Sequence, residues 1–235
     1  MALMKYSTKI TLFSSYFDLN DRLTAKGVLS IFQDVASIHA EEIGVGYLTM
    51  LQKNLYWVLS RVKFDILKMP TPYSNVIVET WPQEKGKIDF DRDMRILSED
   101  GEVLVIASSK WCVIDTIARR LQRTDGVNYL GEVIPDKNYE DKFAKIMLPD
   151  IQPVQKFTHI VRFSDLDHNK HMNNTNYANL VLSAIENKVY THFEINFVNE
   201  CVLNDQICVM HIKDNNKEYV KGVCEGQTAF LAYTC

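Results

Sequence analysis

The sequence predicts an α+β protein made of two copies of one unit, in which a helix comes first and antiparallel strands follow. Three observations lead to this prediction. The chain has 235 residues, enough for two small domains. Two polar segments that contain Asp and Asn each run into apolar residues at helical spacing. Each predicted helix is then followed by short apolar runs that turn residues separate.

The first unit begins with the polar segment 17–24. Val28, Ile31, Phe32 and Val35 then recur at the spacing of one helix face. An Asp-Gly pair between the last two strands of this unit indicates a hairpin turn. The strands expected after the helix are 57–66, 76–81, 89–97 and 103–115.

The second unit begins with the polar segment 163–174 and is shorter. The helix expected after it has five apolar residues on one face, namely Tyr177, Leu180, Val181, Ala184 and Ile185. The strands expected next are 193–198, 207–212, 219–224 and 228–234.

The two polar segments align without a gap. The aligned pairs are Asp18 with Asp167, Asn20 with Asn169, and Arg22 with His171. The first unit therefore lacks the imidazole. It also has Leu67-Lys68-Met69 where the second unit has Asn199-Glu200-Cys201. We expect the second unit to carry the chemistry and the first to be catalytically degenerate.

Domain boundaries are expected on either side of a charged segment that carries prolines. The segment runs from Pro135 to Pro153 and is the best linker candidate. The prediction is a first domain over 1–134, a linker over 135–153 and a second domain over 154–235.

Composition excludes several classes of protein. Apolar residues make up 46% and charged residues 24%, as in soluble globular proteins. A net charge of -4 gives no basic signal for nucleic acid, and no apolar run approaches the ~20 residues of a membrane span. The N-terminus has no secretory signal. Five cysteines, odd in number and without C-x-x-C spacing, suit a reducing cytoplasm.

The segment 163–174 is the strongest candidate for a functional site. Asp167, Asn169 and His171 alternate with other residues, so an extended segment would bring them to one locus. They precede a helix N-terminus, whose free N–H groups suit a developing oxyanion. Helix capping alone is the alternative explanation. A metal site with His168 is weaker, because zinc needs three or four protein ligands and Lys170 adds a cation.

The same segment, followed by Tyr177, resembles the signature of the acyl-acyl carrier protein (acyl-ACP) thioesterases of plant plastids and bacteria. Further segments resemble motifs of that family in the same order and extend over nearly the whole chain. They are Trp57-Val58-Leu59-Ser60-Arg61, Val78-Glu79-Thr80-Trp81, Ser109-Lys110-Trp111, Ala118-Arg119-Arg120-Leu121-Gln122 and Asn199-Glu200-Cys201.

The resemblance implies a tandem hot-dog fold, in which each half wraps an antiparallel sheet around a long central helix. The implied reaction is hydrolysis of fatty acyl-ACP to free fatty acid and holo-ACP, which ends chain elongation in fatty acid biosynthesis. ACP is then the partner, and no cofactor or metal is expected. The missing plant transit segment indicates a bacterial, cytoplasmic enzyme. A homodimer, an acyl-CoA thioesterase, a hydratase and a non-catalytic acyl-binding module remain open alternatives.

The resemblance assigns catalytic roles to Asp167, Asn169, His171 and Glu200. Glu200 is expected to act as the general base that activates water. Asn169 and His171 are expected to orient that water and polarise the carbonyl group, and Asp167 to fix their geometry. Cys201 is the rival, as a nucleophile in the manner of papain. We favour Glu200, because Cys201 shares strand parity with apolar residues and so is expected to be buried.

Substrate-binding candidates lie in the first half. Arg119 and Arg120 form a basic cluster with Arg123 that would suit acidic ACP or the phosphopantetheine phosphate, unless they only solvate a turn. Trp57 and Trp111 would line an acyl tunnel, unless they are ordinary core residues.

Overall fold

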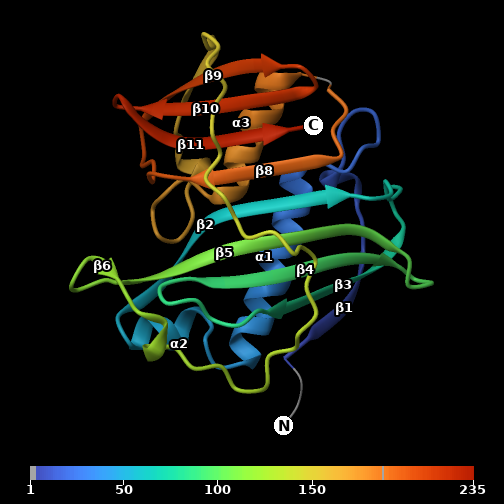
Figure 1. The fold of residues 1–235 in the computed structure, drawn as a ribbon, viewed down its shortest axis with the longest axis vertical. Helices are drawn as coiled ribbons and strands as arrows, with labels where there is room; N and C mark the ends of the chain where they lie inside the picture. Colours follow the sequence, from blue (N-terminus) through green and yellow to red (C-terminus); the bar gives the residue numbers. More distant parts are fainter. Residues whose placement is uncertain (1–3, 187) are drawn as a thin grey trace. The chain divides into compact units, whose positions relative to one another are not determined.

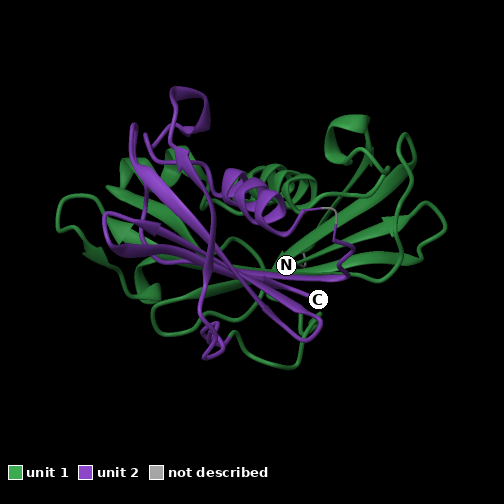
Figure 2. Ribbon diagram, turned by 90° about the horizontal axis from the view of Figure 1, so that it is seen from above, with its two compact units in different colours: residues 1–143 green, residues 144–235 purple. Residues whose placement is uncertain are grey.

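A computed structural model describes residues 4–186 and 188–235 of the chain. The chain separates into two units, Met1–Phe143 and Ala144–Cys235, which Figure 2 shows in different colours. We call them unit 1 and unit 2. The division falls inside the segment 135–153 and leaves residues 135–143 with unit 1.

Unit 1 is one antiparallel sheet with a long helix along one face (Figure 1). Its strand order is β1-β3-β4-β5-β2, and the short β6 pairs with β5. The elements in chain order are β1 (Tyr6–Thr11), the 3-10 helix η1 (Ser14–Tyr16), α1 (Ala25–Glu42), α2 (Tyr47–Gln52), β2 (Leu55–Ile66), β3 (Asn75–Pro82), β4 (Phe90–Ser98), β5 (Val103–Asp115), β6 (Arg120–Leu121) and the 3-10 helix η2 (Thr124–Gly126).

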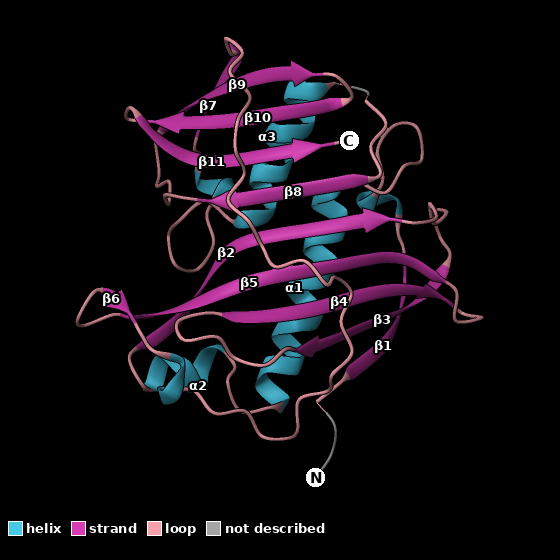
Figure 3. Ribbon diagram, in the orientation of Figure 1, coloured by secondary structure: helices cyan, strands magenta, loops and turns pink. Residues whose placement is uncertain are grey.

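Unit 2 repeats this plan at a smaller size. Its sheet is antiparallel with the order β8-β11-β10-β9-β7, and helix α3 contacts β7, β9 and β10 (Figure 3). The elements in chain order are β7 (Val154–Ile160), the 3-10 helix η3 (Phe163–Asp165), α3 (Asn174–Ile185), β8 (His192–Phe197), β9 (Gln206–Asp214), β10 (Lys217–Cys224) and β11 (Gln227–Thr234).

Both long helices form where the periodicity predicted them. Thr24 caps α1, where its hydroxyl accepts a hydrogen bond from the N–H of Gly27 at 3.0 Å, and Asn173 caps α3 through the N–H of Thr175 at 2.9 Å. All nine apolar residues predicted for the two helix faces are buried. Burying one such large side chain contributes roughly 1.5–3 kcal/mol, so these faces hold each helix on its sheet.

The structure also contains elements that the sequence did not predict. β1 and β7 are edge strands, and most residues of β7 are exposed. Edge strands carry polar residues and have a weak hydrophobic pattern, which hides them from periodicity arguments. α2 is only six residues long and β6 only two, too short to give a periodic signal.

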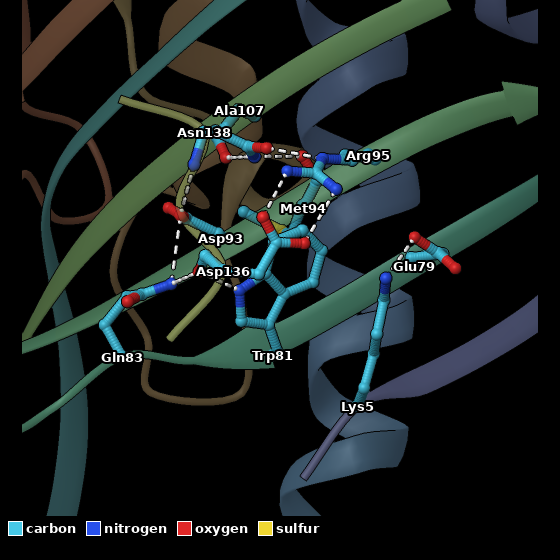
Figure 4. Close-up of polar contacts among 10 residues, drawn as sticks. All are labelled: Lys5, Glu79, Trp81, Gln83, Asp93, Met94, Arg95, Ala107, Asp136 and Asn138. Atoms are coloured by element: carbon cyan, nitrogen blue, oxygen red, sulfur yellow. Dashed lines mark hydrogen bonds and ion pairs between the residues drawn. The ribbon is translucent and has the colours of Figure 1, made fainter. Parts of the chain in front are cut away.

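Residues 135–143 belong with unit 1 because they are hydrogen-bonded to its sheet (Figure 4). The carboxylate of Asp136 accepts two hydrogen bonds from the guanidinium of Arg95, both at 2.8 Å. The Asp136 carbonyl accepts another from the indole of Trp81 at 2.8 Å. The amide of Asn138 donates to carbonyl groups of β4 and β5, each at 2.8 Å. The predicted first domain, which ended at residue 134, therefore omits a segment that the sheet holds.

Among the described residues, no helix is both long enough and apolar enough to cross a membrane.

Candidate active site

Asp167 organises the loop 167–171 of unit 2. Its Oδ1 accepts hydrogen bonds from the N–H of Asn169 at 2.8 Å and of His171 at 3.4 Å. The N–H of Asp167 donates to the carbonyl of His171 at 2.8 Å, and Lys170 takes a left-handed φ of 68°. The loop is therefore a closed turn. The segment is not extended here, because one carboxylate gathers the backbone N–H groups around itself.

The loop brings His171 to Glu200. Nε2 of His171 lies 3.3 Å from Oε2 of Glu200, and the two side chains are 30% and 46% exposed. Backbone contacts fix this pair, since the N–H of Met172 donates to the carbonyl of Cys201 at 2.8 Å and His171 bridges to Val202. An imidazole and a carboxylate that face each other and still reach solvent can bind and deprotonate a water molecule.

Cys201 is buried, whereas this pair reaches solvent. Its side chain is 0% exposed and contacts the side chains of Tyr177 and Cys224. Burial raises the pKa of the Cys201 thiol, which disfavours the thiolate that a nucleophile requires. Glu200 and Cys201 differ in exposure as strand parity suggested, although β8 already ends at Phe197.

Unit 1 contains the same loop with different chemistry. Oδ1 of Asp18 accepts hydrogen bonds from the N–H of Asn20 at 2.8 Å and of Arg22 at 3.0 Å, and Asp21 has a φ of 57°. The other oxygen of Asp18 binds the guanidinium of Arg22 at 2.7–2.8 Å. Burial raises the pKa of Asp18, but the hydrogen bonds and charge of Arg22 outweigh burial and hold that pKa below its usual value.

Hydrogen bonds at the ends of β2 and β8 show that the alignment of residues 67–69 with residues 199–201 must be shifted by one residue. In each unit, two successive N–H groups donate to one carbonyl of the neighbouring strand at 2.8 and 3.1 Å. The donors and acceptor are Leu67, Lys68 and Leu104 in unit 1, and Val198, Asn199 and Ala229 in unit 2. Met69 therefore takes the place of Glu200, and unit 1 lacks the carboxylate as well as the imidazole.

The substrate-binding candidates all lie in unit 1. Arg119 lies on the turn that leads into β6, Arg120 is the first residue of β6, and both are exposed. Trp57 and Trp111 meet edge to face, with ring centroids 6.5 Å apart. Both pack against an apolar cluster of Met4, Ile43, Val45, Met50, Phe90, Val113 and Val127.

The weaker metal hypothesis for the histidines is not supported by their positions. Asp165, a nearby carboxylate that could have joined these histidines as a ligand, is instead bound by His159 at 2.9 Å and by the N–H of Arg162 at 2.8 Å. Within the described part of the chain, His168 and His171 belong to no group of three metal-ligating side chains. Two residues near Cys201 were missed by sequence reasoning. Asp205 approaches Cys201 through the turn 202–205, and Cys224 approaches through the register of β9 and β10.

Comparison with known proteins gives a consistent result for both units. The acyl-ACP thioesterase N-terminal domain model matches residues 4–126, and the C-terminal domain model matches residues 151–227. Oleoyl-acyl carrier protein thioesterase 2 of Arabidopsis thaliana is 29% identical over 238 residues, covering 92% of this chain. The corresponding thioesterase 1 is 29% identical over 229 residues, covering 87% of this chain. The chain spans 65% and 62% of the lengths of these relatives.

Solved structures of similar proteins confirm the predicted α+β tandem hot-dog fold. An acyl-ACP thioesterase from Bacteroides thetaiotaomicron superposes with a TM-score of 0.86 at 23% identity, covering 98% of this chain and 97% of that chain. A 12:0-ACP thioesterase from Umbellularia californica superposes with a TM-score of 0.80 at 20% identity, covering 98% and 96%. Because family models match most of both units, the chain belongs to the acyl-ACP thioesterase family.

Proposed function

We propose that the protein hydrolyses fatty acyl-ACP thioesters to free fatty acid and holo-ACP, with its catalytic residues in unit 2. The observation that carries this proposal is the 3.3 Å contact between Nε2 of His171 and Oε2 of Glu200, in a chain of the acyl-ACP thioesterase family. Curated relatives are named oleoyl- and palmitoyl-acyl carrier protein thioesterases. This step would end fatty acid chain elongation.

The proposed mechanism uses water as the nucleophile. Glu200 accepts a proton from a water molecule bound beside it and His171, and the water oxygen attacks the acyl carbonyl carbon. The side chains of Asn169 and His171 stabilise the oxyanion that forms. The C–S bond then breaks, the carboxylic acid leaves, and the phosphopantetheine sulfur takes up the proton. Asp167 does not touch the substrate in this mechanism and acts by holding the loop.

Substrate binding is assigned to unit 1. Exposed Arg119 and Arg120 would contact the acidic carrier protein or the phosphate of its phosphopantetheine arm. Trp57 and Trp111 would contribute to the acyl pocket, because they border an apolar cluster and are themselves only partly buried. A cytoplasmic location is part of the proposal, supported by the odd number of cysteines without C-x-x-C spacing.

A substrate comparison tests this function. The purified protein is given the same acyl group on ACP and on CoA, and free thiol release is measured. We expect kcat/KM to be higher on acyl-ACP. A higher kcat/KM on acyl-CoA would reassign the enzyme as an acyl-CoA thioesterase. Hydration of a 2-enoyl substrate without thiol release would reassign it as a hydratase, and no turnover of any thioester would leave an acyl-binding module.

A further inference from the structure

Three side chains of unit 2 that can ligate metal ions lie together beside the candidate catalytic residues. Sγ of Cys201, a carboxylate oxygen of Asp205 and Sγ of Cys224 lie within 4.8 Å of one another. Cys201 and Cys224 are 0% and 8% exposed, and Asp205 is only partly exposed. Buried thiols alone are ordinary small hydrophobes, but here a carboxylate oxygen lies among them.

The backbone fixes all three positions. The carboxylate of Asp205 accepts a hydrogen bond from the N–H of Val202 at 2.8 Å, and its own N–H donates to the carbonyl of Val202 at 3.1 Å. These two hydrogen bonds close a turn that brings Asp205 close to Cys201. Ile207 of β9 then pairs with Cys224 of β10, so the sheet register places Asp205 beside the second thiol. A metal ion would therefore meet ligands that are already held in place.

The donor set selects the kind of ion. Cys224 is hydrogen-bonded to the side chains of both Cys201 and Asp205. A single metal ion among the three side chains can therefore take the place of the thiol hydrogens. Thiolate ligands favour Zn²⁺ and similar thiophilic ions, whereas Mg²⁺ and Ca²⁺ require oxygen ligands. Asp205 has further lone pairs, because a carboxylate can accept more hydrogen bonds than those with the Val202 N–H and the Cys224 side chain.

We propose that Cys201, Asp205 and Cys224 form a binding site for a thiophilic divalent cation such as Zn²⁺. On binding, the two S–H bonds break, two protons pass to solvent, and two metal–sulfur bonds form with one metal–oxygen bond. Three protein ligands leave one coordination position for water. This site revises the expectation of a protein without a metal. It lies within unit 2 and does not depend on the proposed hydrolysis.

Cobalt titration tests the site directly. The reduced protein, kept in a phosphine reductant, is titrated with Co²⁺ in place of Zn²⁺. We expect a thiolate-to-cobalt charge-transfer band that saturates at a single equivalent per chain and disappears when Zn²⁺ is added. Cys224→Ser should abolish the band. Cys208→Ser is the matched control, since Cys208 lies on β9 of the same unit but outside the group, and it should keep the band.

A second variant and a measurement of Tm distinguish loss of the metal site from loss of the fold. Asp205→Asn retains both thiols and an oxygen that can accept from Val202, and it should weaken Co²⁺ binding by more than about tenfold. Zn²⁺ should raise the Tm of the wild type and of Cys208→Ser, but not of Cys224→Ser. The proposal fails if the wild type shows no charge-transfer band, if Cys224→Ser keeps it, if Cys208→Ser loses it, or if Asp205→Asn binds Co²⁺ as tightly as the wild type.

Discussion

The loops 18–22 and 167–171 share one backbone and differ in their side chains. In both, one aspartate oxygen accepts hydrogen bonds from the N–H groups two and four residues later, and the residue three positions after the aspartate has a left-handed φ. The aspartate is thus part of the loop architecture whether or not the unit has catalytic residues. The chemical difference lies in two replacements: Arg22 for His171 and Met69 for Glu200. The comparison teaches that retained loop geometry alone does not identify the active unit.

Glu200→Gln should have the largest effect. It keeps the shape of the side chain and removes the base, so kcat should fall by about 10²–10⁴-fold with little change in Tm. The matched control is Met69→Gln, at the equivalent position of unit 1, where kcat should change little. Near-normal turnover by Glu200→Gln together with an inactive Cys201→Ser enzyme would show that Cys201 is the nucleophile.

His171→Ala should lower kcat by about 10²-fold, because a positioned polar group is lost. Its partner variant is Arg22→Ala, which removes a half-buried ion pair with Asp18 and should cost less than about 1 kcal/mol of stability. Steady-state kinetics and urea unfolding on both variants separate the two effects. Equal losses of kcat at the two positions would contradict a single catalytic unit.

The sequence predicted the long helices and the central strands because their apolar residues recur at a fixed period. The edge strands β1 and β7 escaped prediction, since their exposed and polar residues leave a weak hydrophobic pattern. The group 167–171 was predicted as a candidate site because such residues are seldom clustered before a helix without a role. Its turn was not, because the sequence does not show which N–H groups a carboxylate will bind. The equivalence of Met69 in unit 1 and Glu200 in unit 2 could be seen only from the hydrogen bonds that each strand end makes to its neighbouring strand.

Charge reversal at the β6 turn tests whether unit 1 supplies the docking surface for the carrier protein. The double variant Arg119→Glu with Arg120→Glu should lower kcat/KM on acyl-ACP by about tenfold or more, while kcat holds. The defect should shrink as salt rises, since wild-type docking is screened too. Small pantetheine thioesters, which lack the carrier protein, should be hydrolysed normally.

Lys68→Glu is the matched control for this surface. Lys68 is exposed and pairs with Glu102, which precedes β5, whereas the β6 turn follows that strand. The control should leave kcat/KM on acyl-ACP nearly unchanged. If the arginine variant loses the same rate on small thioesters as on acyl-ACP, the arginines support the fold or the pocket, and docking is not their role.

The last prediction concerns the pH dependence of stability in unit 1. His39 of α1 is buried in unit 1, where its Nδ1 accepts a hydrogen bond from the Arg92 guanidinium at 2.9 Å. Burial, and then the charge of Arg92, lower the pKa of His39 from 6.5 to about 4. Between these values the unfolded chain binds more protons than the folded one. The contribution of His39 to stability is therefore complete above pH 6.5 and is lost as the pH falls through about 4.

This loss can be followed in unit 1 alone, because all three tryptophans of the chain, Trp57, Trp81 and Trp111, lie there. Urea unfolding monitored by tryptophan fluorescence should show a stability decrease of up to about 3 kcal/mol from His39 on acidification. His39→Gln keeps an acceptor for Arg92 but binds no proton. It should be less stable than the wild type at about pH 7.5 and lose less stability toward about pH 4.5. Parallel losses in the two proteins would show that His39 does not titrate on unfolding, and that carboxylates alone account for the acid sensitivity of unit 1.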